Sequence, residues 1–300
     1  MKSNKQFLGM AAALAANVIF GFSFVFSKLA LSVAHPLVIL AVRFTVAFLL
    51  MNILWLAGLL KLNFKNKPKG KLLAMAVAQP LLYFILELYG LKMVSSALSG
   101  IIIALVPVGV LVISTLFLRE NPTKTQVFYT LVSIVGISAI SILSNDGEKS
   151  YLLGVALLVG AVIAAAVFNI LSRKEAEHYS PFERTYAMFF IATVGFNIIA
   201  FCVLGKGYFS EVVSAFQSSD FIIAIIYLSV LSSVAAFMLY NYSTSKISAV
   251  RSSSFSNIIT VVSVLGGVII LKEKFSILEL LLCIPVILGV WGVNYQKEKA

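Results

Sequence analysis

Charged residues are scarce in this chain. Asp, Glu, Lys and Arg make up 12% of its 300 residues, whereas 60% of the residues are hydrophobic. Soluble globular domains usually contain roughly a quarter charged residues. The composition therefore excludes an ordinary soluble domain and indicates an integral membrane protein.

Cysteine and histidine are also scarce, with two residues of each. Cys202 and Cys283 lie inside apolar segments without the spacing of metal ligands, which excludes a disulfide framework and a zinc site. His35 and His178 lie at segment ends with no nucleophile or metal ligand near them in the sequence. A membrane enzyme or a receptor is a rival interpretation, but no catalytic residue, metal site or cofactor is expected.

Long apolar runs dominate the sequence, and each is close to the ~20 residues that cross a hydrocarbon core as a helix. Barrel strands would alternate in polarity, so helices are the expected spanning elements. The predicted fold is an all-α integral membrane protein with ten transmembrane helices. The predicted segments are residues 8–31, 37–60, 72–93, 95–118, 125–143, 152–172, 182–204, 221–243, 248–271 and 276–295.

The two halves of the chain resemble each other. At a constant offset of 153, Tyr89 matches Tyr242 and Glu120 matches Glu273. Near the N-terminus the offset is 145, which leaves eight extra residues in the second half, between residues 205 and 220. We therefore expect two repeats of five helices each, at 7–143 and 152–296. Because five is odd, the second repeat must be inverted relative to the first.

The net charge of +11 is distributed along the chain in a way that argues against nucleic-acid binding. With the N-terminus in the cytoplasm, sixteen Lys and Arg residues lie on the cytoplasmic side and seven lie elsewhere. This positive-inside bias predicts a multi-pass protein with both termini in the cytoplasm. The lipid bilayer and a small-molecule metabolite are the expected partners. The sequence leaves open whether the chain forms a homodimer.

Ionisable residues within apolar spans are costly, so they are candidates for function. Lys28, Arg43 and Glu87 are the three in the first half. Lys28 fits a side chain that reaches to the outer interface. Arg43 and Glu87 fit either a structural ion pair or the lining of a water-filled cavity, and the cavity is favoured.

Other polar and aromatic residues share helix faces with these charges. The spacing places Gln79, Tyr83 and Glu87 on one stripe, and Asn17 and Phe24 on a face of the first helix. A third polar stripe in the ninth helix consists of Ser253, Ser256, Asn257 and Thr260. Local bonding of its serines to the backbone is the alternative to a role in the cavity. The proline residues Pro80, Pro107 and Pro285 fall in mid-span, where each is expected to bend its helix. The candidate substrate-binding residues are Glu87, Arg43, Tyr83, Gln79, Asn17, Phe24, Tyr240 and Asn257.

Several motifs carry a resemblance to a known family. They are FGFSFVFSKLAL (20–31), HPLVILAVRF (35–44), YGLKMVSSALSGIIIALVPV (89–108) and LFLRE (116–120), with YNYSTSKISAVRSSS (240–254) and LKEKFS (271–276) in the second half. Together they resemble the EamA-like branch of the drug/metabolite transporter superfamily. The resemblance implies a bacterial inner-membrane carrier of ten helices in two inverted repeats, which often exports amino acids or related metabolites.

The family's pattern is matched at particular positions of this sequence. Lys28, Arg43 and Pro107 fit its helical motifs, and Glu120 and Glu273 fit its markers of the repeat ends. The chain departs from the pattern at Phe20, where the family often has Trp, and at Thr260, where it has proline.

Two functions follow as expectations. The first is proton-coupled export of an amino acid or similar zwitterion, in which Arg43 attracts the carboxylate and Glu87 binds the ammonium group or a coupling proton. The alternative is transport of small organic cations of the quaternary amine type, recognised by Glu87 and aromatic rings. The cavity is expected between the first, third, fourth, sixth, eighth and ninth helices.

Overall fold

A computed structural model describes residues 2–118, 123–143, 149–247, 252, 254–273 and 277–294, which form helices and their connections without any strand. The helices of the first half are α1 (Lys2–Leu31), α2 (Pro36–Leu56), α3 (Gly70–Ala76), η1 (Val77–Leu82), α4 (Tyr83–Met93), α5 (Ser96–Ile103), α6 (Val106–Leu118) and α7 (Lys124–Leu143). Those of the second half are α8 (Lys149–Glu175), α9 (Pro181–Leu204), α10 (Gly207–Ala215), α11 (Ser219–Ile226), η2 (Tyr227–Ala235), α12 (Ala236–Lys246), η3 (Ser254–Ser256), α14 (Asn257–Ile269) and α15 (Ile277–Asn294).

Within this described part of the chain, seven helical stretches are long and apolar enough to cross a membrane. They are Gln6–Leu31, Pro36–Leu56, Gly70–Met93, Ser96–Leu116, Tyr151–Glu175, Pro181–Leu204 and Ser219–Lys246. The helices α7, α14 and α15 lie in the three remaining predicted segments. The all-helical membrane architecture is thus confirmed, while the number of ten crossings stays a prediction.

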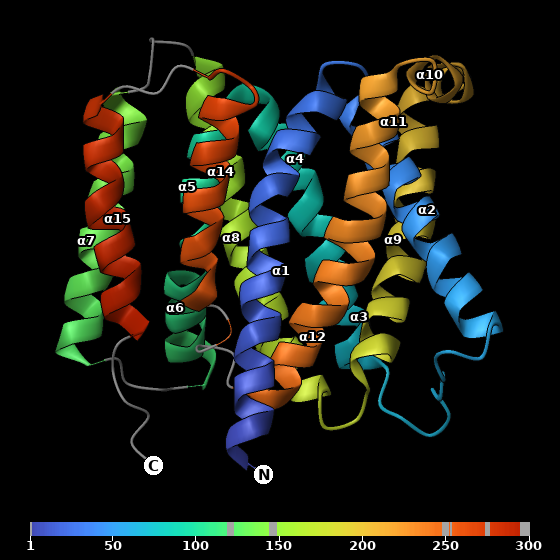
Figure 1. Cartoon of the computed structure of the whole chain (residues 1–300), viewed down its shortest axis with the longest axis horizontal. Helices are drawn as coiled ribbons and strands as arrows, with labels where there is room; N and C mark the ends of the chain where they lie inside the picture. The colour runs from blue at the N-terminus through green and yellow to red at the C-terminus, as the bar shows by residue number, and fades with distance from the viewer. Residues whose placement is uncertain are drawn as a thin grey trace.

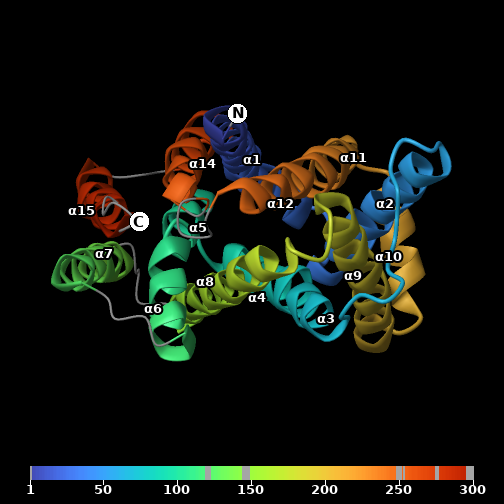
Figure 2. The same ribbon diagram turned by 90° about the horizontal axis from the view of Figure 1, so that it is seen from below.

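The helices run roughly along one common direction (Figure 1). We call the end of the bundle at which α1 begins the proximal end, and the end at which α1 finishes the distal end. Seen along the bundle, α7 and α15 stand as a pair beside the other helices (Figure 2). These two helices pack mainly against each other, α1 packs against α12 and α14, and α8 packs against α4 and α6.

Local sequence explains how α2 and α9 begin. Each has a proline at its first position, where the missing N–H is not needed for the helix. Before α2, the His35 side chain accepts a hydrogen bond from the Leu37 N–H. Before α9, Ser180 and Glu183 form a capping box, with each side chain bonded to the other residue's backbone N–H.

A break in the third predicted span separates α3 from α4. Gln79 has φ −146° and ψ 119°, which is extended rather than helical backbone. The next residue, Pro80, has no N–H and forces the residue before it out of the helical region. The expected bend therefore occurs at Gln79, and it turns this side chain toward the interior of the bundle.

The connection at residues 205–220, which holds the eight extra residues of the second half, contains the short helix α10, which lies across the distal end (Figure 1). Its Tyr208 is buried and donates a hydrogen bond to Asn197 Oδ1 at 2.7 Å. Its Glu211 accepts one from the His35 N–H at 2.8 Å. The helix α10 is thus fixed to the ends of α2 and α9.

A buried arginine ties three helices together at the proximal end. Arg184, in the first turn of α9, is fully buried. It donates hydrogen bonds to the carbonyl oxygen and to the hydroxyl oxygen of Ser172 in α8, at 2.6 and 2.7 Å. It also donates to the Asn241 carbonyl, to Thr244 Oγ1 at 3.1 Å and to Ser245 Oγ at 2.6 Å, all on α12. We infer that this network holds α8, α9 and α12 in register.

Glycine allows α5 to approach α14 closely. A Cβ atom at Gly100 would lie 1.8 Å from Ser263 Oγ and 2.4 Å from its Cβ. Gly100→Ala is therefore expected to destabilise the protein by about 1 to 3 kcal/mol, because a packed interface cannot absorb the added methyl group. Thermal unfolding of the purified protein measures this. The control Gly70→Ala, where nothing lies within 4 Å of the added Cβ, should unfold at the parent's temperature.

Candidate functional site

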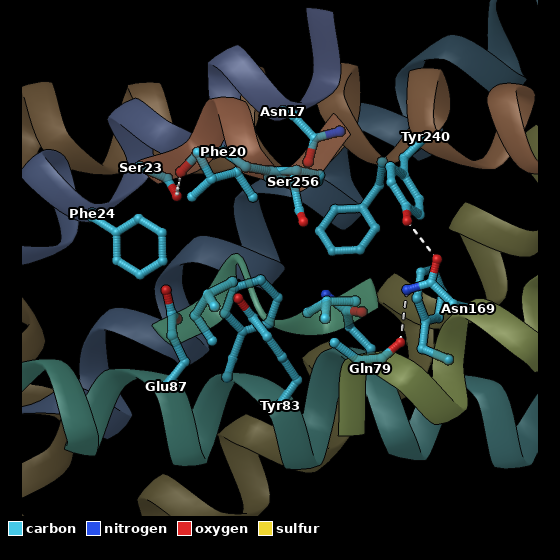
Figure 3. Close-up of a pocket in the computed structure, with 17 residues that line it drawn as sticks. Asn17, Phe20, Ser23, Phe24, Gln79, Tyr83, Glu87, Asn169, Tyr240 and Ser256 are labelled. Atoms are coloured by element: carbon cyan, nitrogen blue, oxygen red, sulfur yellow. Dashed lines mark hydrogen bonds between the residues drawn. The ribbon is translucent and has the colours of Figure 1, made fainter. Parts of the chain in front are cut away.

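A pocket lies in the middle of the bundle, between α1, α4, α5, α6, α8, α12 and the start of α14. These elements belong to the same six spans between which the sequence predicts a cavity. The cavity between the lining side chains has a volume of about 50 Å³, which is small beside the roughly 300 to 1,000 Å³ that is usual for ligand pockets. A metabolite larger than a few water molecules would therefore require the lining side chains to move apart. Figure 3 shows Glu87 at one end of the pocket, and Asn169 and Tyr240 at the other.

Among the described residues that line the pocket, Glu87 is the only charged one. Its side chain is 2% exposed, and its Oε2 atom has no hydrogen-bond partner in the described chain. An ionised carboxylate without a partner is strongly disfavoured in an apolar interior. A proton or a substrate cation at Glu87 would remove this cost, so the site can bind either of them.

Arg43 lies behind the pocket and is not part of its lining. It is 2% exposed and donates hydrogen bonds to Ser233 Oγ at 2.9 Å and Ser232 Oγ at 3.1 Å. Its guanidinium carbon is 4.3 Å from the centre of the Phe84 ring, a cation–π distance. Arg43 and Glu87 interact electrostatically, but the single ion pair within 4 Å among the described side chains joins Lys67 to Glu183.

The end of the pocket opposite Glu87 is polar but uncharged (Figure 3). Tyr240 donates to Asn169 Oδ1, and Asn169 Nδ2 donates to the Ala165 carbonyl at 2.8 Å. Asn17 Nδ2 donates to the Ala13 carbonyl at 2.7 Å. The amide of Gln79 forms no hydrogen bond with other described residues, so this side chain can bind a polar group of a ligand.

Aromatic rings form much of the wall between these two ends. Phe20 meets Phe237 edge to face with 5.2 Å between the ring centres, and Phe168 stacks on Tyr240 at 6.2 Å. Such rings bind the apolar part of a ligand, and their faces attract a positive charge. A carboxylate beside aromatic faces is therefore an environment that suits an organic ammonium group.

The structure brings most of the predicted site residues together. Those that line the pocket are Asn17, Phe24, Gln79, Tyr83, Glu87 and Tyr240. The side chain of Asn257 lies outside the described part of the chain, as do Ser253 of the third stripe and the repeat-end marker Glu120. The sequence reasoning did not single out Asn169, although an amide in an otherwise apolar span of the second half was the signal that could have identified it.

Comparison with known proteins agrees with this membrane architecture. The sequence profile of the EamA-like transporter family matches residues 7–142 and 152–295. The chain belongs to the EamA-like transporter family. As an EamA-like protein with several apolar helices of membrane length, it is a multi-pass membrane protein.

Relatives of this EamA-like chain are themselves named as transporters. It is 35% identical over 301 residues to the uncharacterized transporter YcxC of Bacillus subtilis, with 100% of this chain and 96% of that protein covered. It is 26% identical over 280 residues to an uncharacterized transporter of Archaeoglobus fulgidus, with 92% and 95% covered. These names indicate a membrane transporter rather than an enzyme.

More distant matches agree with the EamA-like assignment in fold. Protein PagO of Salmonella typhimurium is 26% identical over 216 residues, with 69% of this chain and 67% of that protein covered. A solved crystal structure superposes with a TM-score of 0.68 over 95% of both chains at 16% identity, a likeness that concerns the fold alone.

Proposed function

We propose that the protein is a secondary active transporter that carries small metabolites across the cytoplasmic membrane through the central pocket. The observation that carries this proposal is the buried carboxylate of Glu87, whose Oε2 atom has no hydrogen-bond partner among the described residues, in a pocket lined by helices of both halves. Ionisable groups at membrane depth usually belong to substrate or proton pathways. Both termini lie in the cytoplasm in this proposal, so the distal end of the bundle faces outward.

The transport cycle in this proposal is alternating access between two inverted repeats, at 7–143 and 152–296. Reciprocal packing supports it. The helix α1 packs against α12 and α14, while its counterpart α8 packs against α4 and α6, the counterparts of α12 and α14 in the first half. In addition, α2 packs against its own counterpart α9, and α7 packs against its own counterpart α15. This is the contact pattern of two halves related by a twofold axis.

The first candidate process is proton-coupled export of an amino acid or similar zwitterion. Glu87 would bind either the ammonium group or a proton, and this competition would couple the two movements. In this candidate Arg43 binds the carboxylate, which requires its side chain to leave Ser232 and Ser233 and turn into the pocket.

The second candidate is transport of small organic cations. The position of Arg43 outside the lining favours it, because the pocket then offers one negative charge, aromatic walls and an uncharged polar end. A carboxylated ligand would be buried there without a positive partner, which is unfavourable. An amine without a carboxylate would meet a complementary charge at Glu87.

A matched pair of ligands tests both candidates in proteoliposomes with an imposed pH gradient. Phenylalanine and phenethylamine differ only in the carboxylate. We expect uptake of at least one of the two compounds, both of which carry an ammonium group, to depend on the pH gradient. If phenylalanine is transported or competes, the zwitterion candidate is supported. If only phenethylamine does so, the cation candidate is supported. If neither compound, nor a panel of other amino acids and quaternary amines, is transported or shifts the unfolding temperature, the proposed function is wrong.

A further inference from the structure

A carboxylate joins two pocket-lining helices at the distal end of the bundle. Glu273, just beyond α14, accepts hydrogen bonds from the Ser96 N–H at 2.9 Å, the Ser96 hydroxyl at 2.7 Å and the Ala97 N–H at 3.3 Å. Both backbone donors belong to the first turn of α5, where N–H groups have no partner within the helix. The third N–H of that turn, on Leu98, is bonded to Ser95 Oγ at 3.1 Å.

The chain after α14 is shaped to present this carboxylate. Lys272 has φ 54°, in the left-handed region, and the Glu273 N–H bonds back to the Gly267 carbonyl at 3.0 Å. This bond turns Glu273 back along the last turn of α14. A Cβ at Gly267 would lie 2.6 Å from Glu273 Oε2 and 2.7 Å from Ser96 Oγ, so an added methyl group would displace the two side chains that form the contact.

A third helix joins at the same place. Lys28, near the end of α1, interacts electrostatically with Glu273, and α1 packs against both α14 and α5. Farther from the distal end, these helices line the pocket with Phe24 of α1, Ile103 of α5 and Ile259 of α14. At the distal end, Glu273 therefore interacts with residues of three helices that line the pocket, α1, α5 and α14.

We propose that Glu273 is the latch that closes the distal end of the transport pathway and is released when that end opens. The proposal rests on the proposed transport function. Its chemistry suits a reversible contact, because bonds from a carboxylate to a helix N-terminus are charge-assisted and directional. When α5 and α14 separate, water at the end of the bundle can replace each bond, so the open state is not prevented.

A variant pair tests the latch by accessibility rather than by transport. In a chain carrying Cys202→Ser and Cys283→Ala, Ile103→Cys places one thiol in the pocket. A membrane-impermeant maleimide is added from the distal side of sealed vesicles, with the side established by a tag at the N-terminus. Glu273→Gln should raise the labelling rate about tenfold, since loss of charge-assisted bonds shifts the closed state toward the open one. Ser96→Ala, which removes one donor, should give a smaller rise.

Glu211→Gln is the matched control. Glu211 also caps a helix N-terminus at the distal end, through the His35 N–H, but it joins α10 to α2 and not to a wall of the pocket. Its labelling rate should equal that of the parent. The latch is refuted if Glu273→Gln labels at the parental rate, if Glu211→Gln labels equally fast, or if the increase is seen only from the proximal side. Because no substrate is needed, failure of the substrate proposals would not alter this result.

Discussion

Glu87→Gln is expected to lower transport of an ammonium-bearing substrate by about 30-fold or more, the equivalent of about 2 kcal/mol for loss of a buried charge pair. The amide keeps the shape of the side chain but can neither pair with the cation nor exchange a proton. The remaining transport should no longer respond to an imposed pH gradient. Initial rates in proteoliposomes at equal protein content measure both effects.

Stability should change little, because two effects oppose each other. Removing the charge relieves the unpartnered Oε2 atom of Glu87, but it also takes away the negative charge that offsets the buried Arg43. Glu175→Gln is the matched control, because Glu175 is 1% exposed, also has an unpartnered Oε2 atom and lies outside the pocket lining. The Glu175→Gln variant should transport the substrate at the parental rate. Parental transport and pH response in Glu87→Gln would show that Glu87 is structural.

Arg184→Ala is expected to have the largest effect on stability, a loss of at least about 3 kcal/mol. The substitution leaves a void where a fully buried side chain stood, and it removes the donor from the Ser172 and Asn241 carbonyls and from three hydroxyl groups. Monodisperse protein remaining after heating in detergent measures this loss. Arg184→Lys should recover only part of it, since an ammonium group cannot reach acceptors spread over α8 and α12.

Arg173→Ala provides the comparison for Arg184. Arg173 has the same charge and lies at the same end of the bundle, but it is exposed and donates one hydrogen bond, to the Thr244 carbonyl at 2.9 Å. Its loss should change stability by about 0.5 kcal/mol or less. Equal unfolding temperatures for the two alanine variants would contradict the role assigned to the network.

The sequence was sufficient to predict the helical membrane fold because apolar length is a local property. The sequence was less reliable in predicting where helices are interrupted. Of the three prolines, Pro80 follows the break at Gln79 and Pro107 follows a break between α5 and α6, whereas Pro285 lies within an uninterrupted α15. A proline permits a bend, but the neighbouring helices decide whether one forms.

Side-chain partners were the least predictable part of the site. Helical spacing indicates the face on which a residue lies, and Gln79, Tyr83 and Glu87 all line the pocket although the helix is broken at Gln79. Spacing cannot show what lies across that face. The serines that bind Arg43 are 189 and 190 positions away in the sequence. The burial of Arg184 was unpredictable for the same reason. The sequence groups it with the cytoplasmic loop charges, but its acceptors lie on other helices.

The helix α10 has a consequence for the balance of the cycle. A carrier assembled from two identical inverted halves would have inward-facing and outward-facing forms of equal free energy. The extra residues between 205 and 220 occur in the second half alone, and there Tyr208 of α10 is bonded to Asn197 of α9 at the distal end. In the proposed cycle, the time that an empty carrier spends facing each side would therefore depend on residues that the duplication does not share, and the packing of α10 on α9 is one such difference.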